Sequence, residues 1–249
     1  MDNTKAKDPN LTPKKFFDAP PTEWMVKGVI PRGCVTVLAG DPGEGKTALA
    51  LQLSGCMMQP AIFLGQSTKP GRVLWVQQDC SDTQMRDVIE LQRSRYSTLV
   101  NLEGHSVDFS PRITRRVEWL GKASKGYDLL VVDSLLGISA GSINDSEAMT
   151  NCVHTLKRIA SKNNLAVLLL HHLRKPGDGD FNTSEDRSAG SFAIKAACDT
   201  FFSLYQSGHY TELKPSTRKF RGRRDFYKLV LKLDKATYSF RLIRKVPID

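Results

Sequence analysis

The chain has 249 residues, of which 40% are hydrophobic and 25% are charged, values that suit one large globular domain and exclude wholesale disorder and fibrous structure. No apolar run approaches the length of a membrane span, and the first residues, MDNTKAKDPN, lack the apolar core of a signal peptide. We therefore expect a cytoplasmic protein without a membrane partner. The formal net charge of +10 favours an anionic partner.

In chain order, residues 1–23 are polar and proline-rich and are expected to form an N-terminal arm, with residues 24–249 forming one domain. Near-continuous apolar runs predict strands at 34–39, 73–77, 129–133, 165–172 and 200–205. Helical patterns lie near 46–57, 82–95, 112–124, 145–163 and 189–197. Apolar strands that alternate with helices predict an α/β fold, with a mostly parallel sheet covered by helices on both faces.

The last quarter of the chain has a different pattern. Residues 226–233 and 237–244 alternate between apolar and polar positions around the turn-like DKA, which predicts a C-terminal β-hairpin. Between Lys214 and Lys245, the many lysines and arginines are opposed only by Asp225 and Asp234. Such a basic stripe is typical of a surface that binds phosphate groups, although a solvated face without a partner has a similar composition.

The segment 40-GDPGEGKT-47 follows the first predicted strand and precedes the first predicted helix. It matches the spacing G-x-x-x-x-G-K-[ST] of a phosphate-binding loop, whose glycines let successive backbone N–H groups face phosphates. We expect Lys46 to reach the β- and γ-phosphates of ATP and Thr47 to hold Mg²⁺. The predicted nucleotide-binding residues are Gly40, Asp41, Pro42, Gly43, Glu44, Gly45, Lys46, Thr47 and Ala48.

Two carboxylates follow other predicted strands. Asp133 ends the run 127-YDLLVVDS-134 in the manner of a Walker B strand, and it is the second candidate ligand of Mg²⁺. Asp79 follows 73-VLWVQ-77, although it could instead cap the next helix. Because the carboxyl ends of parallel strands meet at one edge of a sheet, we expect both to lie near the phosphate-binding loop.

The chain resembles a known family in these motifs and in two further segments, the lead-in 24-WMVKGVIPRGCVTVLAGDPGEGKT-47 and the strand end 168-LLLHHLRK-175. It resembles the RecA-like P-loop ATPases related to the RepA-like hexameric plasmid-replication helicases, and more distantly the DnaB-type replicative helicases. The resemblance extends from about Trp24 to the C-terminal hairpin. It implies a RecA-like core that uses ATP and Mg²⁺ and assembles with copies of itself, as a hexameric ring.

The resemblance also implies roles for further residues. Asp79 stands where the family has a catalytic glutamate that acts on the attacking water, and its shorter side chain leaves slow hydrolysis possible. One histidine of the pair at 171–172 would sense the γ-phosphate, and His171 is the candidate. Lys219 and Arg221 match the K-x-R spacing of residues that a neighbouring subunit supplies to the phosphates. The segments 137–145 and 173–190 correspond to loops that line a channel for single-stranded DNA.

The function predicted on these grounds is an ATP-hydrolysing motor that acts on DNA, as a replication or mobile-element helicase with partners from those processes. A regulatory ATPase whose nucleotide state gates a protein partner is the alternative, favoured by Asp79 and by the mixed charge of 173–190. A small-molecule kinase would share the phosphate-binding loop. The Asp-Ser end of the Walker B strand and the His-His strand speak against it.

Overall fold

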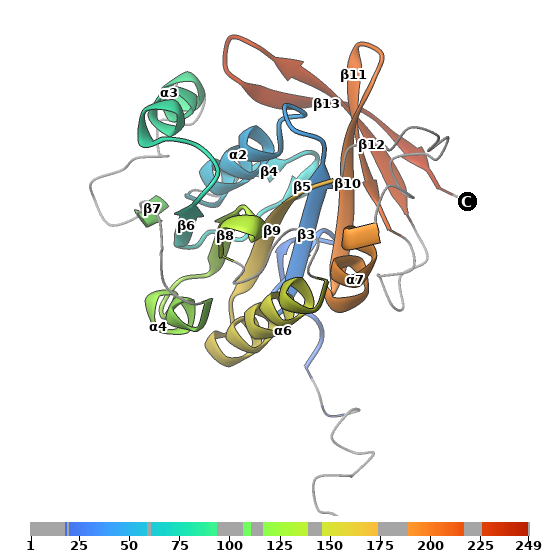
Figure 1. The fold of residues 1–249 in the computed structure, drawn as a ribbon. Helices are drawn as coiled ribbons and strands as arrows, with labels where there is room; N and C mark the ends of the chain where they lie inside the picture. Colours follow the sequence, from blue (N-terminus) through green and yellow to red (C-terminus); the bar gives the residue numbers. More distant parts are fainter. Residues whose placement is uncertain are drawn as a thin grey trace, which may run out of the picture.

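A computed structural model describes residue 18 and residues 20–58, 61–93, 107–110, 117–138, 146–173, 189–216 and 226–248. Within these residues, a central sheet runs in the order β13-β12-β11-β10-β3-β9-β8-β6-β7 (Figure 1). Its parallel part consists of β7 (Val107–Ser110), β6 (Val73–Gln77), β8 (Leu129–Asp133), β9 (Ala166–His172), β3 (Val35–Gly40) and β10 (Thr200–Ser207). Strands β11 (Tyr210–Pro215), β12 (Tyr227–Asp234) and β13 (Ser239–Pro247) extend it in antiparallel fashion.

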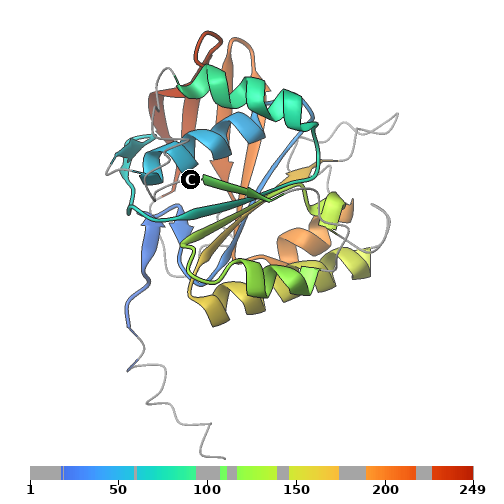
Figure 2. The ribbon, with the colours of Figure 1, turned by 90° about the vertical axis from the view of Figure 1, so that its left-hand side faces the viewer.

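Helices cover both faces of the parallel strands, as Figure 2 shows. On one face lie α2 (Lys46–Met58) and α3 (Asp82–Arg93). On the other lie the 3-10 turn η2 (Val117–Trp119), α4 (Leu120–Ala123), α5 (Leu135–Ile138), α6 (Ser146–Asn163) and α7 (Ala189–Ala197). Two apolar cores result, one containing Leu51, Trp75 and Phe240 and the other containing Leu156 and Leu169. Burial from both sides explains why β3, β6 and β8 are buried along their whole length.

The fold class predicted from the sequence is confirmed. The five apolar runs form β3, β6, β8, β9 and β10, and the predicted hairpin forms β12 and β13. The sequence pattern did not reveal β7, β11 or the two small hairpins β1 (Trp24–Val26) with β2 (Ile30–Pro31) and β4 (Ile62–Phe63) with β5 (Gln66–Ser67). The predicted helix near 112–124 is present from Val117 onward, since 111–116 lie outside the described residues.

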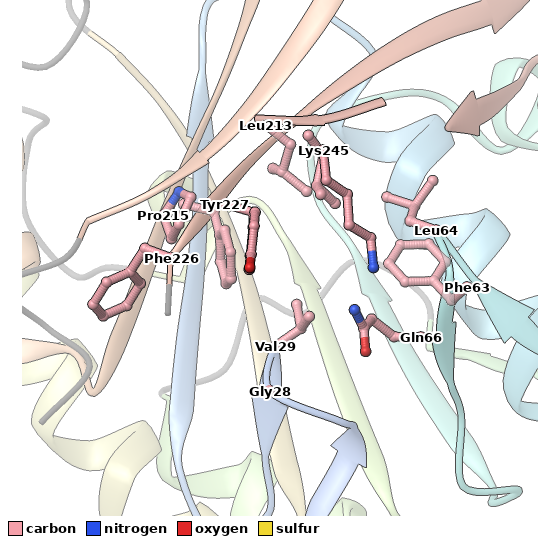
Figure 3. Close-up of a pocket in the computed structure, with 12 residues that line it drawn as sticks. Gly28, Val29, Phe63, Leu64, Gln66, Leu213, Pro215, Phe226, Tyr227 and Lys245 are labelled. Carbon is pink, nitrogen blue, oxygen red and sulfur yellow. The ribbon is translucent and has the colours of Figure 1, made fainter. Parts of the chain in front are cut away.

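The inner face of the antiparallel strands packs against the two small hairpins. A pocket remains between them, with Leu213, Tyr227 and Lys245 on one side and Val29 and Phe63 on the other (Figure 3). This packing attaches the C-terminal strands to the α2 side of the parallel sheet. The strands are therefore part of the same domain core.

Most of the predicted N-terminal arm, residues 1–17 and 19, lies outside the described residues, so the boundary at Trp24 stays a prediction. Within the part of the chain that the structure describes, no helix combines the length and hydropathy that crossing a bilayer requires.

Candidate nucleotide site

The phosphate-binding loop joins the end of β3 to the start of α2. Gly43 and Gly45 adopt φ angles of 86° and 89°, a conformation that glycine tolerates best. A Cβ atom at Gly45 would lie 2.7 Å from the ring of Phe240, and one at Gly40 would lie 2.5 Å from the carbonyl oxygen of Leu204. The glycines are therefore required both by the turn and by the strands that pack against the loop.

Lys46, the first residue of α2, is buried against the loop. Its Nζ donates to the carbonyl oxygens of Gly40 and Asp41, both at 2.9 Å, and lies 3.2 Å from Nδ1 of His172. Burial lowers the pKa of Lys46, while nearby carboxylates, Asp133 first, oppose this effect. The amine is thus held against the backbone of the loop.

Thr47 and Asp133 meet directly, although 86 residues separate them. The hydroxyl of Thr47 donates to Oδ2 of Asp133 at 2.7 Å, and Asp133 is only 2% exposed at the end of β8. Burial raises the pKa of Asp133 to about 6, and the hydrogen bond from Thr47 lowers it. A hydroxyl and a buried carboxylate side by side are hard oxygen donors of the kind that Mg²⁺ prefers, so the residues fit the cation.

Asp79 lies just beyond β6 and pairs with His172. Nε2 of His172 is 2.7 Å from Oδ2 of Asp79, and the Asp79 side chain is 42% exposed. The same imidazole contacts Lys46 through its other nitrogen. His172 therefore connects the lysine of the loop to the carboxylate expected to act on water.

His171, by contrast, is 6% exposed, and burial lowers its pKa to about 4. The parallel register of β9 with β3 places His171 opposite Ala39 and His172 opposite Gly40. Successive strand residues point to opposite faces. His172 is the histidine that contacts Lys46 and Asp79.

Three contacts around the loop were not foreseen from the sequence. Oε1 of Glu44 accepts a hydrogen bond from the backbone N–H of Gln206 in β10, and Oε2 accepts one from the N–H of Asp41. Gln52, in the middle of α2, exchanges two hydrogen bonds with the backbone of Phe240. The contacts of Glu44 with Gln206 and of Gln52 with Phe240 join residues far apart in sequence, and no local pattern indicates such a pairing.

Other predicted residues lie outside the described part of the chain. These are Lys219 and Arg221, and most of the segments 137–145 and 173–190. Their proposed roles stay predictions. The described residues nevertheless bring together the loop, Asp79, Asp133 and the histidine pair at the carboxyl end of the parallel strands.

Comparison with known proteins identifies the family. A family model described as an AAA domain matches residues 8–178, which is more than half of the chain. The chain belongs to this family. Its fold is that of a RecA-like P-loop ATPase domain, and solved structures of DnaB-like helicases are similar to it in fold.

One curated relative and two solved structures give more detail. Over 164 residues the chain is 22% identical to the DNA repair and recombination protein RadB of Methanosphaera stadtmanae, covering 63% of this chain and 66% of RadB. A DnaB-like replicative helicase, solved in a study of its interactions with primase, is similar with a TM-score of 0.65 and 14% identity, over 84% of this chain and 57% of the helicase chain. The ATPase domain of G40P is similar with a TM-score of 0.65 and 13% identity, over 86% of both chains. The chain thus spans about two thirds of RadB and a little over half of the DnaB-like chain.

Proposed function

We propose that this ATPase forms a ring or filament, hydrolyses MgATP between subunits and moves on or remodels DNA as a replication or mobile-element helicase. A hexameric ring in the cytoplasm, with single-stranded DNA as its substrate, is the specific form of the proposal. The observation that carries it is the convergence of Lys46, Thr47, Asp133 and the Asp79–His172 pair at one end of the parallel sheet.

Each of these side chains has a proposed task. Lys46 binds the β- and γ-phosphates, and Thr47 and Asp133 hold Mg²⁺, which when bound neutralises charge on those phosphates. Asp79 accepts a proton from the attacking water. We assign the γ-phosphate sensor to His172 in place of His171, because His172 contacts both Lys46 and Asp79.

Hydrolysis between subunits requires groups from a neighbouring copy, and we propose Lys219 and Arg221 for this role. A guanidinium supplied in this way contributes about a thousandfold or more to the rate in related phosphoryl-transfer enzymes. DNA as the substrate is supported by the net charge of +10 and by relatives described as a DNA repair and recombination protein and a replicative helicase.

A regulatory switch that gates a protein partner is the second candidate. The observation that favours it is the state of Asp79, a shorter carboxylate than glutamate and already bound by His172. A base that is displaced by about 1 Å or held by another group gives slow hydrolysis. Such a protein would stay in its ATP-bound state for long periods, as a switch requires.

ATP hydrolysis measured with and without single-stranded DNA, at low and at moderate salt, separates the two. Stimulation that persists at moderate salt supports the DNA motor. Tight ATP binding with slow turnover that ignores DNA supports the switch. The Lys46→Ala variant serves as the control, because it removes the phosphate contact and should abolish turnover in either case.

A further inference from the structure

The C-terminal strands have two very different faces. Alternation along β11, β12 and β13 places Leu213, Leu229, Leu231 and Phe240 on the inner face, where they join the core beside α2. The residues between them point to the opposite, outer face, and Arg244 joins them because the register shifts by one residue at Ile243. We name this the outer basic face and define it by the cations Lys214, Lys228, Lys232, Arg241 and Arg244.

The register of the sheet brings these cations into adjoining rows. Lys232 pairs with Arg241, Val230 pairs with Arg244, and Glu212 lies opposite Val230 from the other side. Neighbouring strands are about 4.8 Å apart, and residues four apart on one strand are separated by about 13 Å. The cations therefore lie in adjoining rows across three strands and form one positive surface.

Negative charge on the described part of this face is limited. Glu212 accepts a hydrogen bond from the hydroxyl of Tyr205 at 2.6 Å and forms an ion pair with Lys228 at 2.8 Å. The negative charge of Glu212 is therefore compensated within the face. Asp234 lies at the end of β12, where its carboxylate accepts the N–H of Ala236. Lys232, Arg241 and Arg244 are exposed. The face thus has a strong net positive charge that is available to solvent.

Two aromatic side chains accompany the cations. Tyr205 and Tyr210 stand on the same outer face, and Tyr210 is 42% exposed next to the Lys232 row. Surfaces that bind single-stranded nucleic acid combine cations, which contact the phosphates, with exposed aromatic rings, which stack on the bases. A duplex offers phosphates but no free base faces, and an acidic protein offers neither regular phosphates nor bases.

We propose that the outer basic face binds single-stranded DNA, with the cations on its phosphates and Tyr210 stacked on a base. This proposal rests on the function proposed above, and it adds a contact separate from the segments 137–145 and 173–190.

The test is binding of a short fluorescent oligodeoxythymidylate, measured by anisotropy at several salt concentrations. The variant Lys232→Gln/Arg241→Gln/Arg244→Gln should weaken binding about tenfold or more, and the slope of log affinity against log salt should fall by about 2, since each single-strand phosphate contact contributes about 0.7. The control Lys122→Gln/Lys125→Gln/Lys162→Gln removes the same net charge from exposed sites on and after α4 and on α6. It should change affinity by about twofold or less.

A second variant tests the stacking. Tyr210→Ala should weaken binding to oligodeoxythymidylate about fivefold or more, and it should leave binding to an abasic strand of equal length unchanged. Equal losses on both strands would overturn the assignment of Tyr210.

The outcomes separate this inference from the proposed function. If the unmodified protein binds no DNA, both fail. If it binds DNA and the outer-face variant behaves like its control, this inference alone is wrong. A variant that keeps its DNA affinity but changes the size of the assembly would identify the face as a contact between copies, and that result also overturns the inference.

Discussion

Replacing Gln52 by leucine tests how firmly the C-terminal strands are joined to the nucleotide-binding helix. Gln52 is 3% exposed, its Nε2 donates to the carbonyl oxygen of Phe240 at 2.9 Å, and its Oε1 accepts the N–H of Phe240 at 2.7 Å. Phe240 lies in β13, an edge strand of the sheet. The amide of Gln52 therefore satisfies the two backbone groups of Phe240 that no further strand can pair.

The cost of Gln52→Leu follows from these two bonds. Each buried backbone group left unpaired costs about 2 kcal/mol, and burial of the larger apolar side chain offsets about 1 kcal/mol. We expect the free energy of unfolding to fall by about 3 kcal/mol, which lowers the Tm of a domain of this size by about 6–12 °C. ATP affinity should fall as well, because α2 begins at Lys46 and the ring of Phe240 contacts the Gly45 region.

Urea denaturation and calorimetric titration with a non-hydrolysable ATP analogue measure both effects. Gln84→Leu is the comparison variant, since Gln84 is exposed and its Oε1 accepts only the N–H and hydroxyl of Ser81 at the start of α3, so its substitution should cost about 1 kcal/mol or less. The reasoning is refuted if Gln52→Leu unfolds within about 0.5 kcal/mol of the unmodified protein.

Three further predictions concern the nucleotide site. Asp79→Asn should reduce ATP hydrolysis by about a hundredfold or more without weakening ATP binding, and full turnover in a steady-state assay would remove Asp79 as the base. Because burial lowers the pKa of His171 to about 4, the unfolded chain takes up a proton there first as pH falls, so about 3 kcal/mol of stability should be lost between pH 6.5 and pH 4. His171→Gln should flatten that part of the stability profile, and an unchanged slope in urea titrations would contradict the assignment. Mixing Arg221→Ala subunits with Lys46→Ala subunits should restore part of the turnover if the arginine acts across subunits; assembled mixtures that stay inactive would count against it.

The parallel core could be predicted because burial on both faces leaves a local signature. Strands such as 73–77 and 129–133 are apolar at nearly every position, and such runs are visible in the sequence alone. Strand β7, with the sequence VDFS, and strand β11, with the sequence YTELKP, are short and mix polar with apolar residues. Their pairing depends on neighbours that the sequence does not specify locally.

The site was predicted in part for a similar reason. The spacing of Gly40, Gly45, Lys46 and Thr47 is a local property, so the loop could be placed on its strand and helix. Which histidine reaches Lys46 depends on the register of β9 against β3, and that register is set by packing over the whole sheet. The pairing of Glu44 with Gln206 depends in turn on β10 lying beside β3.

Part of the support of the phosphate-binding loop lies outside the region that the family model matches. That match ends at residue 178, whereas Gln206 holds Glu44 and the ring of Phe240 faces Gly45 from strands beyond it. A Cβ at Gly45 would lie 2.7 Å from that ring, so the loop and β13 pack directly against each other. If a rearrangement of β13 changes the shape of the loop, nucleotide binding must in turn favour one arrangement of β13, since coupling between two sites is reciprocal. If the outer basic face binds DNA, the strand that carries Arg241 and Arg244 on one side and Phe240 on the other is the physical connection between DNA and ATP.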